Sequence, residues 1–175
     1  MSPDPIQRAA MHPREINERS ATQKLSAPAA PRAVVLIRAA IGFVFITEGI
    51  QKFLDPDTLC VGRFAKIGIP SPGLAAPFVG GVEIVCGALV LIGLLARLGA
   101  FALMIDMVVA ITSTKIPILI GHGFWGFAAP AGHAGFWAMA HEARTDVAML
   151  LGCGFIIAVG AGSMSLDRRV SRRTR

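Results

Sequence analysis

The stretch "RAAIGFVFITEGIQKF", residues 38–53, combines a run of apolar residues with three charged ones, Arg38, Glu48 and Lys52. A segment this apolar favours lipid over water, and a charged side chain at the centre of a bilayer costs at least about 2.5–3.5 kcal/mol. Steps of three and four residues return to the same face of a helix. One face therefore carries two of the charges together with two glycines, and we expect it to contact protein rather than lipid. Its residues are Arg38, Gly42, Phe45, Gly49 and Lys52.

The composition of the whole chain also favours a membrane protein. Its 175 residues are 54% hydrophobic, with a mean hydropathy of +0.62, which is more than a soluble domain of this length needs. The net charge of +6 would suit nucleic acid, but ten of the 17 Lys and Arg residues lie outside the apolar part of the chain. We therefore expect the lipid bilayer, and no nucleic acid, as a partner. These ten are Arg8, Arg14, Arg19, Lys24, Arg32, Arg168, Arg169, Arg172, Arg173 and Arg175.

Four apolar segments predict an all-α integral membrane protein, a four-helix bundle. Each segment is long enough, or nearly so, to cross about 30 Å of hydrocarbon. Residues 116–142 mix Gly, Pro, His, Phe and Trp, which favours a long extracytoplasmic loop between the third and fourth spans. The spans are expected at about 33–51, 74–96, 98–115 and 143–162.

Charge at the ends of the spans predicts the orientation. Four spans place both termini and the turn at Arg97 on one side, and that side carries most of the Lys and Arg residues. By the positive-inside rule we expect a multi-pass protein of the bacterial inner (plasma) membrane with both termini in the cytoplasm. The expected organisation is a disordered cytoplasmic tail at 1–32, a four-span membrane domain at 33–165, and a basic cytoplasmic tail at 166–175.

The second and third predicted spans each carry a carboxyl near mid-membrane, Glu83 and Asp106. We expect such groups to form an ion pair or a hydrogen bond, or to hold a proton. Glu83 shares a helix face with Gly80, Gly87 and Arg97, so this face should also contact protein. A polar network that only fixes helix register is the alternative to a ligand site. The residues of this predicted network or site are Arg38, Glu48, Lys52, Glu83, Arg97, Asp106 and Asp146; no catalytic residue is assigned.

Other kinds of site find little support in the sequence. His122, His133 and His141, with the adjacent Glu142, would lie in the long loop, but their spacings match no metal motif, so no metal site is predicted. The three cysteines form no C-x-x-C pair, which argues against a dithiol or disulfide scaffold. The glycines lie in apolar segments and not in a phosphate-binding loop.

Three motifs together resemble the DoxX family of small bacterial and archaeal membrane proteins. They are R-x3-G-x2-F-x3-G-x2-K from Arg38 to Lys52, G-x2-E-x3-G-x2-L from Gly80 leading to Arg97, and the final "GAGSMSLDRR". The likeness covers about residues 33–168. Family members usually carry a Glu at the start of the fourth span, where this chain has Asp146, and the loop at 116–142 is not typical of them. The family's closing G-x-G-x-x-S-L-D is present here as Gly160, Gly162, Ser165, Leu166 and Asp167.

The resemblance implies a role in redox chemistry at the membrane. The family is named after a membrane subunit associated with thiosulfate-to-quinone electron transfer, and other members are linked to thiol or quinone redox homeostasis. It implies a membrane subunit or quinone-interacting component of an oxidoreductase system, with quinone as the cofactor and a soluble or membrane redox partner. Whether the chain is itself an enzyme, and whether it forms a homo-oligomer, stays open. The motif residues that the resemblance marks as functional or fold-defining are Arg38, Lys52, Glu83, Arg97 and Asp167.

Two other functions are kept as alternatives. Carboxyls at mid-membrane are what proton relays use, so a small proton-coupled transporter is one. The other is a nonenzymatic scaffold that recruits a soluble enzyme through its basic tails. Because the sequence carries no cofactor motif, a redox role would need a bound quinone, a flavin, a metal or a partner subunit.

Overall fold

The computed structural model describes residues 30–162 and 164–166, and this part of the chain is helical. Three of its helical stretches are long and apolar enough to cross a membrane: Arg32–Leu54, Pro72–Ile92 and Ala96–Ile120. The described residues include no strand, only an isolated bridge between Phe124 and Phe127. For the described residues, the prediction of an all-α fold with several helices long and apolar enough to span a membrane is therefore confirmed.

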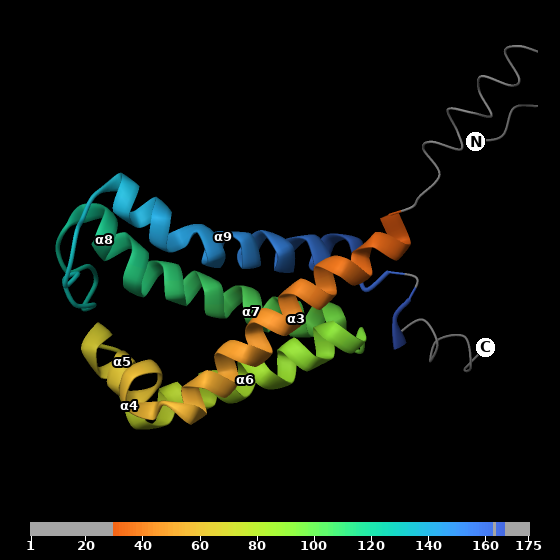
Figure 1. The fold of residues 1–175 in the computed structure, drawn as a ribbon, viewed down its shortest axis with the longest axis horizontal. Coiled ribbons are helices and arrows are strands. Elements are labelled where there is room, and N and C mark those ends of the chain that lie inside the picture. The colour runs from red at the N-terminus through yellow and green to blue at the C-terminus, as the bar shows by residue number, and fades with distance from the viewer. Residues whose placement is uncertain (1–29, 163, 167–175) are drawn as a thin grey trace, which may run out of the picture.

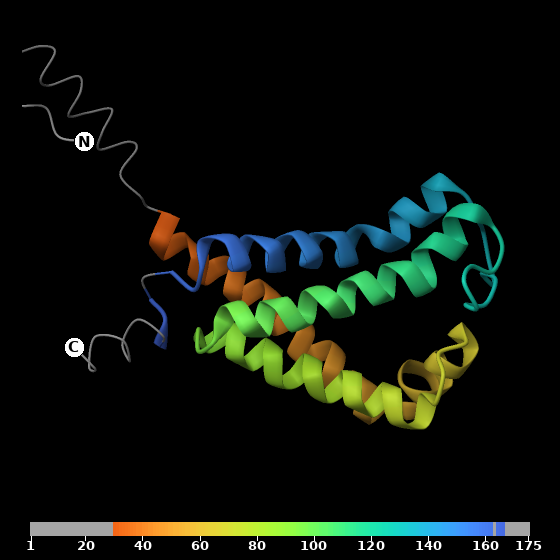
Figure 2. The same cartoon turned by 180° about the vertical axis from the view of Figure 1, so that it is seen from behind.

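Long helices lie side by side along the molecule (Figure 1). α3 packs along α6, α6 along α7, and α7 along α9. Figure 2 shows α7, η1 and α8 continuing into one another beside α9. In chain order the elements are α3 (Ala30–Leu54), α4 (Pro56–Leu59), α5 (Val61–Ile67), α6 (Pro72–Ile92), α7 (Ala96–Ala110), the π-helical turn η1 (Ile111–Lys115), α8 (Ile116–Ile120) and α9 (Phe136–Val159).

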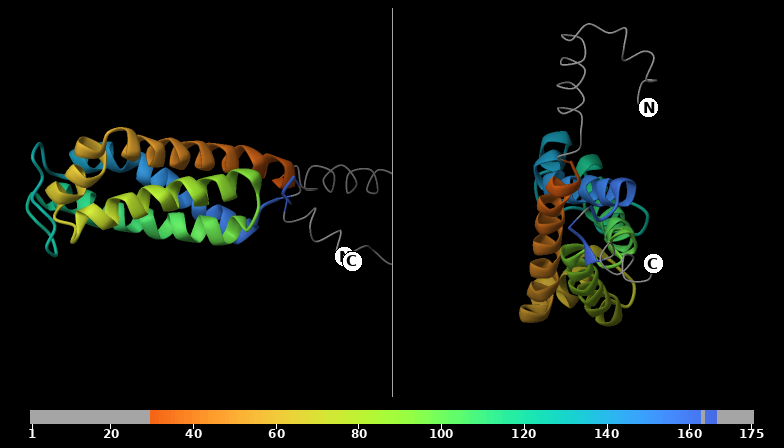
Figure 3. Two further views of the ribbon diagram at one scale, coloured as in Figure 1. Left: turned by 90° about the horizontal axis from the view of Figure 1, so that it is seen from below. Right: turned by 90° about the vertical axis from the view of Figure 1, so that its right-hand side faces the viewer.

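The two ends of the bundle differ. The start of α3, the α6–α7 turn and the end of α9 lie together at one end, which we call the terminal end (Figure 3). The short helices α4 and α5 and residues 121–135 lie at the other, the loop end. Figure 1 also shows the α3–α6 pair diverging from the α7–α9 pair toward the loop end.

Glycines set the close approach of α3 and α6. A Cβ added to Gly49 would lie 2.7 Å from the carbonyl oxygen of Gly80, and one added to Gly42 would lie 2.9 Å from that of Gly87. Such distances leave no room for a side chain at either position of α3. The charged stripe of α3 does face protein, because Arg38, Gly42, Phe45 and Gly49 are all buried and Lys52 is half-buried. Its counterpart on α6 is buried at Gly80, Glu83, Gly87 and Val90.

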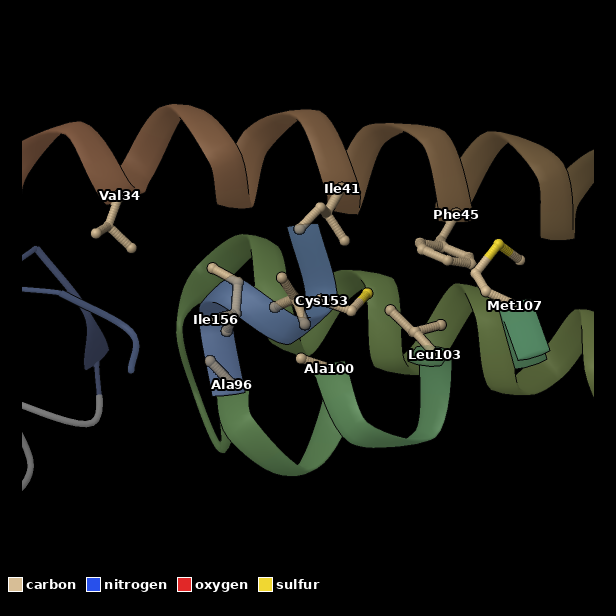
Figure 4. Close-up of a cluster of buried hydrophobic side chains, with 10 residues drawn as sticks. Val34, Ile41, Phe45, Ala96, Ala100, Leu103, Met107, Cys153 and Ile156 are labelled. Atoms are coloured by element: carbon tan, nitrogen blue, oxygen red, sulfur yellow. The ribbon is translucent and has the colours of Figure 1, made fainter. Parts of the chain in front are cut away.

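An apolar core fills the terminal half of the bundle. Figure 4 shows side chains of α3, α7 and α9 meeting there. This core places apolar side chains between the helices of the terminal half. Its fully or nearly fully buried members are Val34, Ile41, Phe45, Val90, Ala96, Ala100, Leu103, Met107, Cys153 and Ile156.

Three expectations about the limits of the helices change. α3 begins at Ala30, three residues before the predicted span, so the helix includes the end of the expected tail; residues 1–29 and 167–175 lie outside the described part. The α6–α7 turn lies at residues 93–95, where Gly93 adopts φ +72°, and leaves Arg97 inside α7.

The expected loop at 116–142 is also shorter than predicted. Its first residues form α8, which tolerates Pro117 because a proline at the start of a helix loses no hydrogen bond. Gly121, at φ +79°, ends that helix, and α9 begins at Phe136. The non-helical segment is therefore residues 121–135.

α9 differs in composition from the three apolar stretches. It is 24 residues long and lies beside α7, but it carries Glu142, Arg144 and Asp146 near its start. These charges set it apart from the helices that qualify as membrane spans by composition alone.

The glycine contact between α3 and α6 can be tested with a matched pair of substitutions. We expect Gly49→Ala to lower the free energy of unfolding by about 1–3 kcal/mol, because the added methyl group overlaps the α6 backbone. Gly81→Ala, on the same pair of helices but facing open space, should be neutral or stabilising by up to about 1 kcal/mol. Thermal unfolding in mild detergent measures both; equal effects would contradict close packing at Gly49.

Candidate functional site

A cavity of about 610 Å³ lies between the loop-end halves of the long helices, under α5. Its volume is typical of sites for small molecules. Five aromatic and sulfur-containing side chains contribute to its wall: Phe45 from α3, Phe64 from α5, Met107 from α7, Phe127 from the loop and Met149 from α9. The wall is therefore apolar over much of its area, and the charged groups described next stand out in it.

Lys52 and Glu83 form a buried ion pair in this wall. The Lys52 Nζ donates to both carboxylate oxygens of Glu83, at 2.6 Å to Oε1 and 2.5 Å to Oε2. The two side chains are 12% and 4% exposed, so little water reaches them. Side chains of a helix lean toward its N-terminus, and α3 and α6 are antiparallel, which brings these two groups toward each other.

Asp106 approaches the same pair from α7. Its carboxyl lies close enough to that of Glu83 for the two groups to interact directly, and it also faces Lys52. The Asp106 Oδ2 atom is buried and has no hydrogen-bond partner within the part of the chain that the structure describes. The two mid-membrane carboxyls of the sequence analysis therefore do lie together, but the cation is bound by Glu83.

A second charge cluster surrounds Lys115, at the end of η1. Its Nζ lies 3.4 Å from Oδ2 of Asp146 and 3.9 Å from Oε2 of Glu142, both on α9. Lys115 is only 7% exposed. A π-helical turn holds one more residue than an α-helical turn and often occurs at functional sites. Here the π-helical turn ends at Lys115, which is buried against α9 just before α8 begins.

The remaining charged groups make the cavity acidic. Glu48 from α3 and Arg63 from α5 also line it. Two cations, Lys52 and Arg63, stand against five carboxyls in the wall, with Lys115 beside them as a third cation. The five are Glu48, Glu83, Asp106, Glu142 and Asp146.

Arg38 lies outside the cavity, at the terminal end. Its guanidinium donates from Nε to the carbonyl of Val90 (2.8 Å) and from Nη2 to that of Leu91 (2.7 Å), at the end of α6. Its Nη1 donates to the carbonyls of Ala161 (2.9 Å) and Met164 (3.2 Å), which follow α9. Arg38 therefore ties together three parts of the fold: α3, the end of α6 and the segment that follows α9.

The other described residue of the predicted network at the terminal end is Arg97. Arg97 is exposed, and its Nη2 donates to the carbonyl of Ala158 at 3.4 Å. Neither Arg38 nor Arg97 lines the cavity. Asp167 lies outside the described residues.

Two segments that the sequence did not predict as part of the site, α5 and the loop at residues 121–135, contribute to the cavity wall. α5 ends at Gly68, which adopts φ +90°, and the carbonyl of Ile67 accepts a 2.8 Å hydrogen bond from the backbone of Ala128. This bond ties α5 to the loop, and both contribute a phenylalanine to the cavity wall. The signal in the sequence that could have identified the contribution of α5 was the amphipathic pattern of Phe64 and Ile67.

A further cavity of about 560 Å³ lies at the loop end, against α5, α8 and the loop. Lys66, His133 and His141 are among its lining residues. Throughout residues 30–162 and 164–166, no three His, Cys, Asp or Glu side chains come together as metal ligands would.

The fold and the site define a helical membrane protein with an internal polar cavity, and comparison with known proteins agrees. The family model described as DoxX matches residues 33–122. The uncharacterized membrane protein Rv3486 of Mycobacterium tuberculosis (strain ATCC 25618 / H37Rv) is 53% identical over 143 residues, which cover 82% of this chain and 84% of that protein. No solved structure matches the chain. The chain belongs to the DoxX family of membrane proteins.

The tie made by Arg38 predicts a large cost for a conservative change. Arg38→Lys keeps the charge but cannot reach carbonyls of α6 and of the C-terminal segment together, so we expect a loss of at least about 2 kcal/mol in unfolding free energy. Arg97→Lys, at an exposed position with one long hydrogen bond, should change it by less than about 0.5 kcal/mol. Thermal unfolding in detergent compares the two, and equal stabilities would refute the tie.

The Lys52–Glu83 pair predicts a non-additive cycle. Lys52→Met leaves Glu83 buried without its cation and should cost about 3–5 kcal/mol of unfolding free energy. Adding Glu83→Gln removes the unpaired charge and should recover most of that loss. Unfolding of the two single variants and the double variant measures the coupling; additive effects would mean that the pair is not formed.

Proposed function

We propose that α9 is a fourth span of a bacterial inner membrane and that the terminal end of the protein faces the cytoplasm. The 24 residues of α9 span about 36 Å at 1.5 Å per residue, enough to cross about 30 Å of hydrocarbon. Glu142 and Asp146 support this placement because they line the cavity with Lys115 nearby. The positive-inside rule supports the orientation, since the ten flanking cations belong to the two ends of the chain.

The function that the geometry supports best is binding of a quinone, as the membrane component of an oxidoreductase or redox-homeostasis system. The observation that carries it is the cavity of about 610 Å³, in which the buried Lys52 lies among aromatic and aliphatic side chains as well as carboxyls. A quinone head group is a flat, apolar ring with carbonyl oxygens that accept hydrogen bonds. Such a ligand needs aromatic and aliphatic contacts and a few well-placed donors.

Lys52 is the residue placed to recognise a carbonyl oxygen. An ammonium group has three donors, and two of them serve the Glu83 carboxylate. The third can serve a ligand while Glu83 holds the ammonium in place. Phe45, Phe64 and Phe127 supply faces against which a ring can pack.

The chain needs a partner to complete a redox reaction. A quinone carries electrons and protons once bound, but the side chains of this site supply no electron carrier. Electrons must therefore come from a soluble or membrane redox partner or from a small-molecule donor. The protein's own part is to hold the ring, donate a hydrogen bond from Lys52 and exclude water from the terminal half.

A transporter fits this geometry less well. Alternating access needs a path that can open to either side of the membrane. Here the cavity occupies the loop half, while the terminal half is filled by the buried core from Val34 to Ile156. The one-sided arrangement favours a binding site over a conduit.

Quinone content tests the proposal. Protein purified in mild detergent from a quinone-producing host should yield close to one extractable quinone per chain, and added ubiquinone or menaquinone analogues should bind saturably. The double variant Lys52→Met/Glu83→Gln should lose at least about tenfold in affinity, the value of one good hydrogen bond to a charged group.

The matched control is Lys66→Met, a lysine of α5 that does not line this cavity. It should keep wild-type quinone affinity. Size-exclusion profiles and unfolding temperatures establish that each variant is folded. Folded wild-type protein that neither retains nor binds quinone would refute the proposal, as would equal losses in the two variants.

A further inference from the structure

Lys52 and Lys115 already have carboxylate partners, and among the described residues one buried carboxyl oxygen has none. Lys52 is held by both oxygens of Glu83, and Lys115 by Asp146 and Glu142. Arg63 lies on the exposed face of α5. Asp106 is left beside Glu83 with its Oδ2 atom buried and unpartnered among the described residues.

Every element packed around Asp106 contributes to its electrostatic surroundings. Glu83 is near enough to interact with it directly, and Cys153 of α9 also faces it. Negative groups outnumber positive ones at this point of the bundle. The charged and titratable groups are Glu48 and Lys52 from α3, Arg63 from α5, Glu83 from α6, Lys115 from η1, and Glu142, Asp146 and Cys153 from α9.

Two neighbouring carboxyls cannot both carry a charge cheaply here. Like charges that share a buried site disfavour double ionisation, and among the described residues Lys52 is the cation that forms an ion pair with either carboxyl. A second uncompensated charge near mid-membrane would add a cost of several kcal/mol. Protonating one carboxyl removes that cost and gives it a donor for its neighbour.

From this geometry we infer that Asp106 and Glu83 form a proton-binding site, which exchanges one shared proton with water at the loop end through the cavity. The site does not depend on quinone, because it rests on the carboxyl pair, the single cation and the cavity. Both carboxyls line that cavity. On the other side the apolar core, including Leu103 and Cys153, separates them from the terminal end.

If a quinone does bind, this site lies where its chemistry needs it. Reduction of a quinone to a quinol takes up two electrons and two protons, and the electrons come from the redox partner or donor of the proposed function. The shared proton would be the first of the two delivered to the ring, water at the loop end would protonate the carboxyl pair again, and the pair would then deliver the second. The proton-binding site would exist in the absence of that reaction.

Infrared difference spectroscopy of the quinone-free protein in lipid nanodiscs tests the inference. The wild type should show, at neutral pH, the carbonyl stretch of a protonated buried carboxyl, and this band should vanish at strongly alkaline pH. Asp106→Asn should abolish or shift the band, and Glu83→Gln should change its frequency because it alters the neighbour of the shared proton. Asp106→Asn keeps both the side-chain volume and the Lys52–Glu83 pair, so it should fold; Glu83→Gln leaves Lys52 unpaired, so the double variant Lys52→Met/Glu83→Gln is measured beside it.

The matched control is Asp57→Asn, an exposed carboxyl of α4 that does not line the cavity. It should leave the band unchanged. A wild-type protein with no such band, or a band that survives in both Asp106→Asn and Glu83→Gln, would overturn the proton-binding site. Because no quinone is present, this result is independent of whether quinone binds.

Hydrogen–deuterium exchange of the same band tests the route. Ala110 lines the cavity, so Ala110→Phe should fill it and slow exchange into heavy water at least tenfold. Val108→Phe adds a ring at an exposed position of α7 that does not line the cavity and should not slow it. Equal exchange rates in two folded variants would overturn the route through the cavity.

Discussion

The structure depends on one constraint: a charge taken into an apolar bundle must be satisfied by the protein, because the hydrocarbon region supplies no water. α3 meets this constraint twice on one stripe. Arg38 binds backbone carbonyls at the end of α6 and beyond α9, and Lys52 binds the carboxylate of Glu83. The glycines between them allow α3 and α6 to approach closely enough for both contacts.

The two buried cations of α3, Arg38 and Lys52, lie in halves of the bundle that have different properties. At the terminal end the guanidinium and the apolar core tie the helices together and leave little free volume. At the loop end the helix pairs diverge around a cavity whose charged groups interact with one another. Stability is thus concentrated in the first half, so the second half can hold buried charges that a uniformly packed bundle would not tolerate.

The sequence predicted the faces of the helices better than the partners of their charges. Spacing alone identified the buried stripes of α3 and α6, because a helical period depends only on position. It did not pair Lys52 with Glu83, because Lys52 lies at the end of the first predicted span and Glu83 near the middle of the second. Counting residues along a span ignores how far side chains lean along a helix. The targets of Arg38 are backbone carbonyls, which carry no side-chain signature. The π-turn and α8 were missed because glycine and proline around them resemble a loop.

The contact between Arg38 and Ala161 joins residues 123 positions apart in the chain. A ribosome adding 5–20 residues per second makes the second partner roughly 6–25 s after the first. During that interval the arginine of α3 can reach the carbonyls of Val90 and Leu91 at most, because the segment after α9 has not yet been made. Folding is therefore divided into an insertion stage and a later locking stage, in which the segment that follows α9 completes the contacts of Arg38.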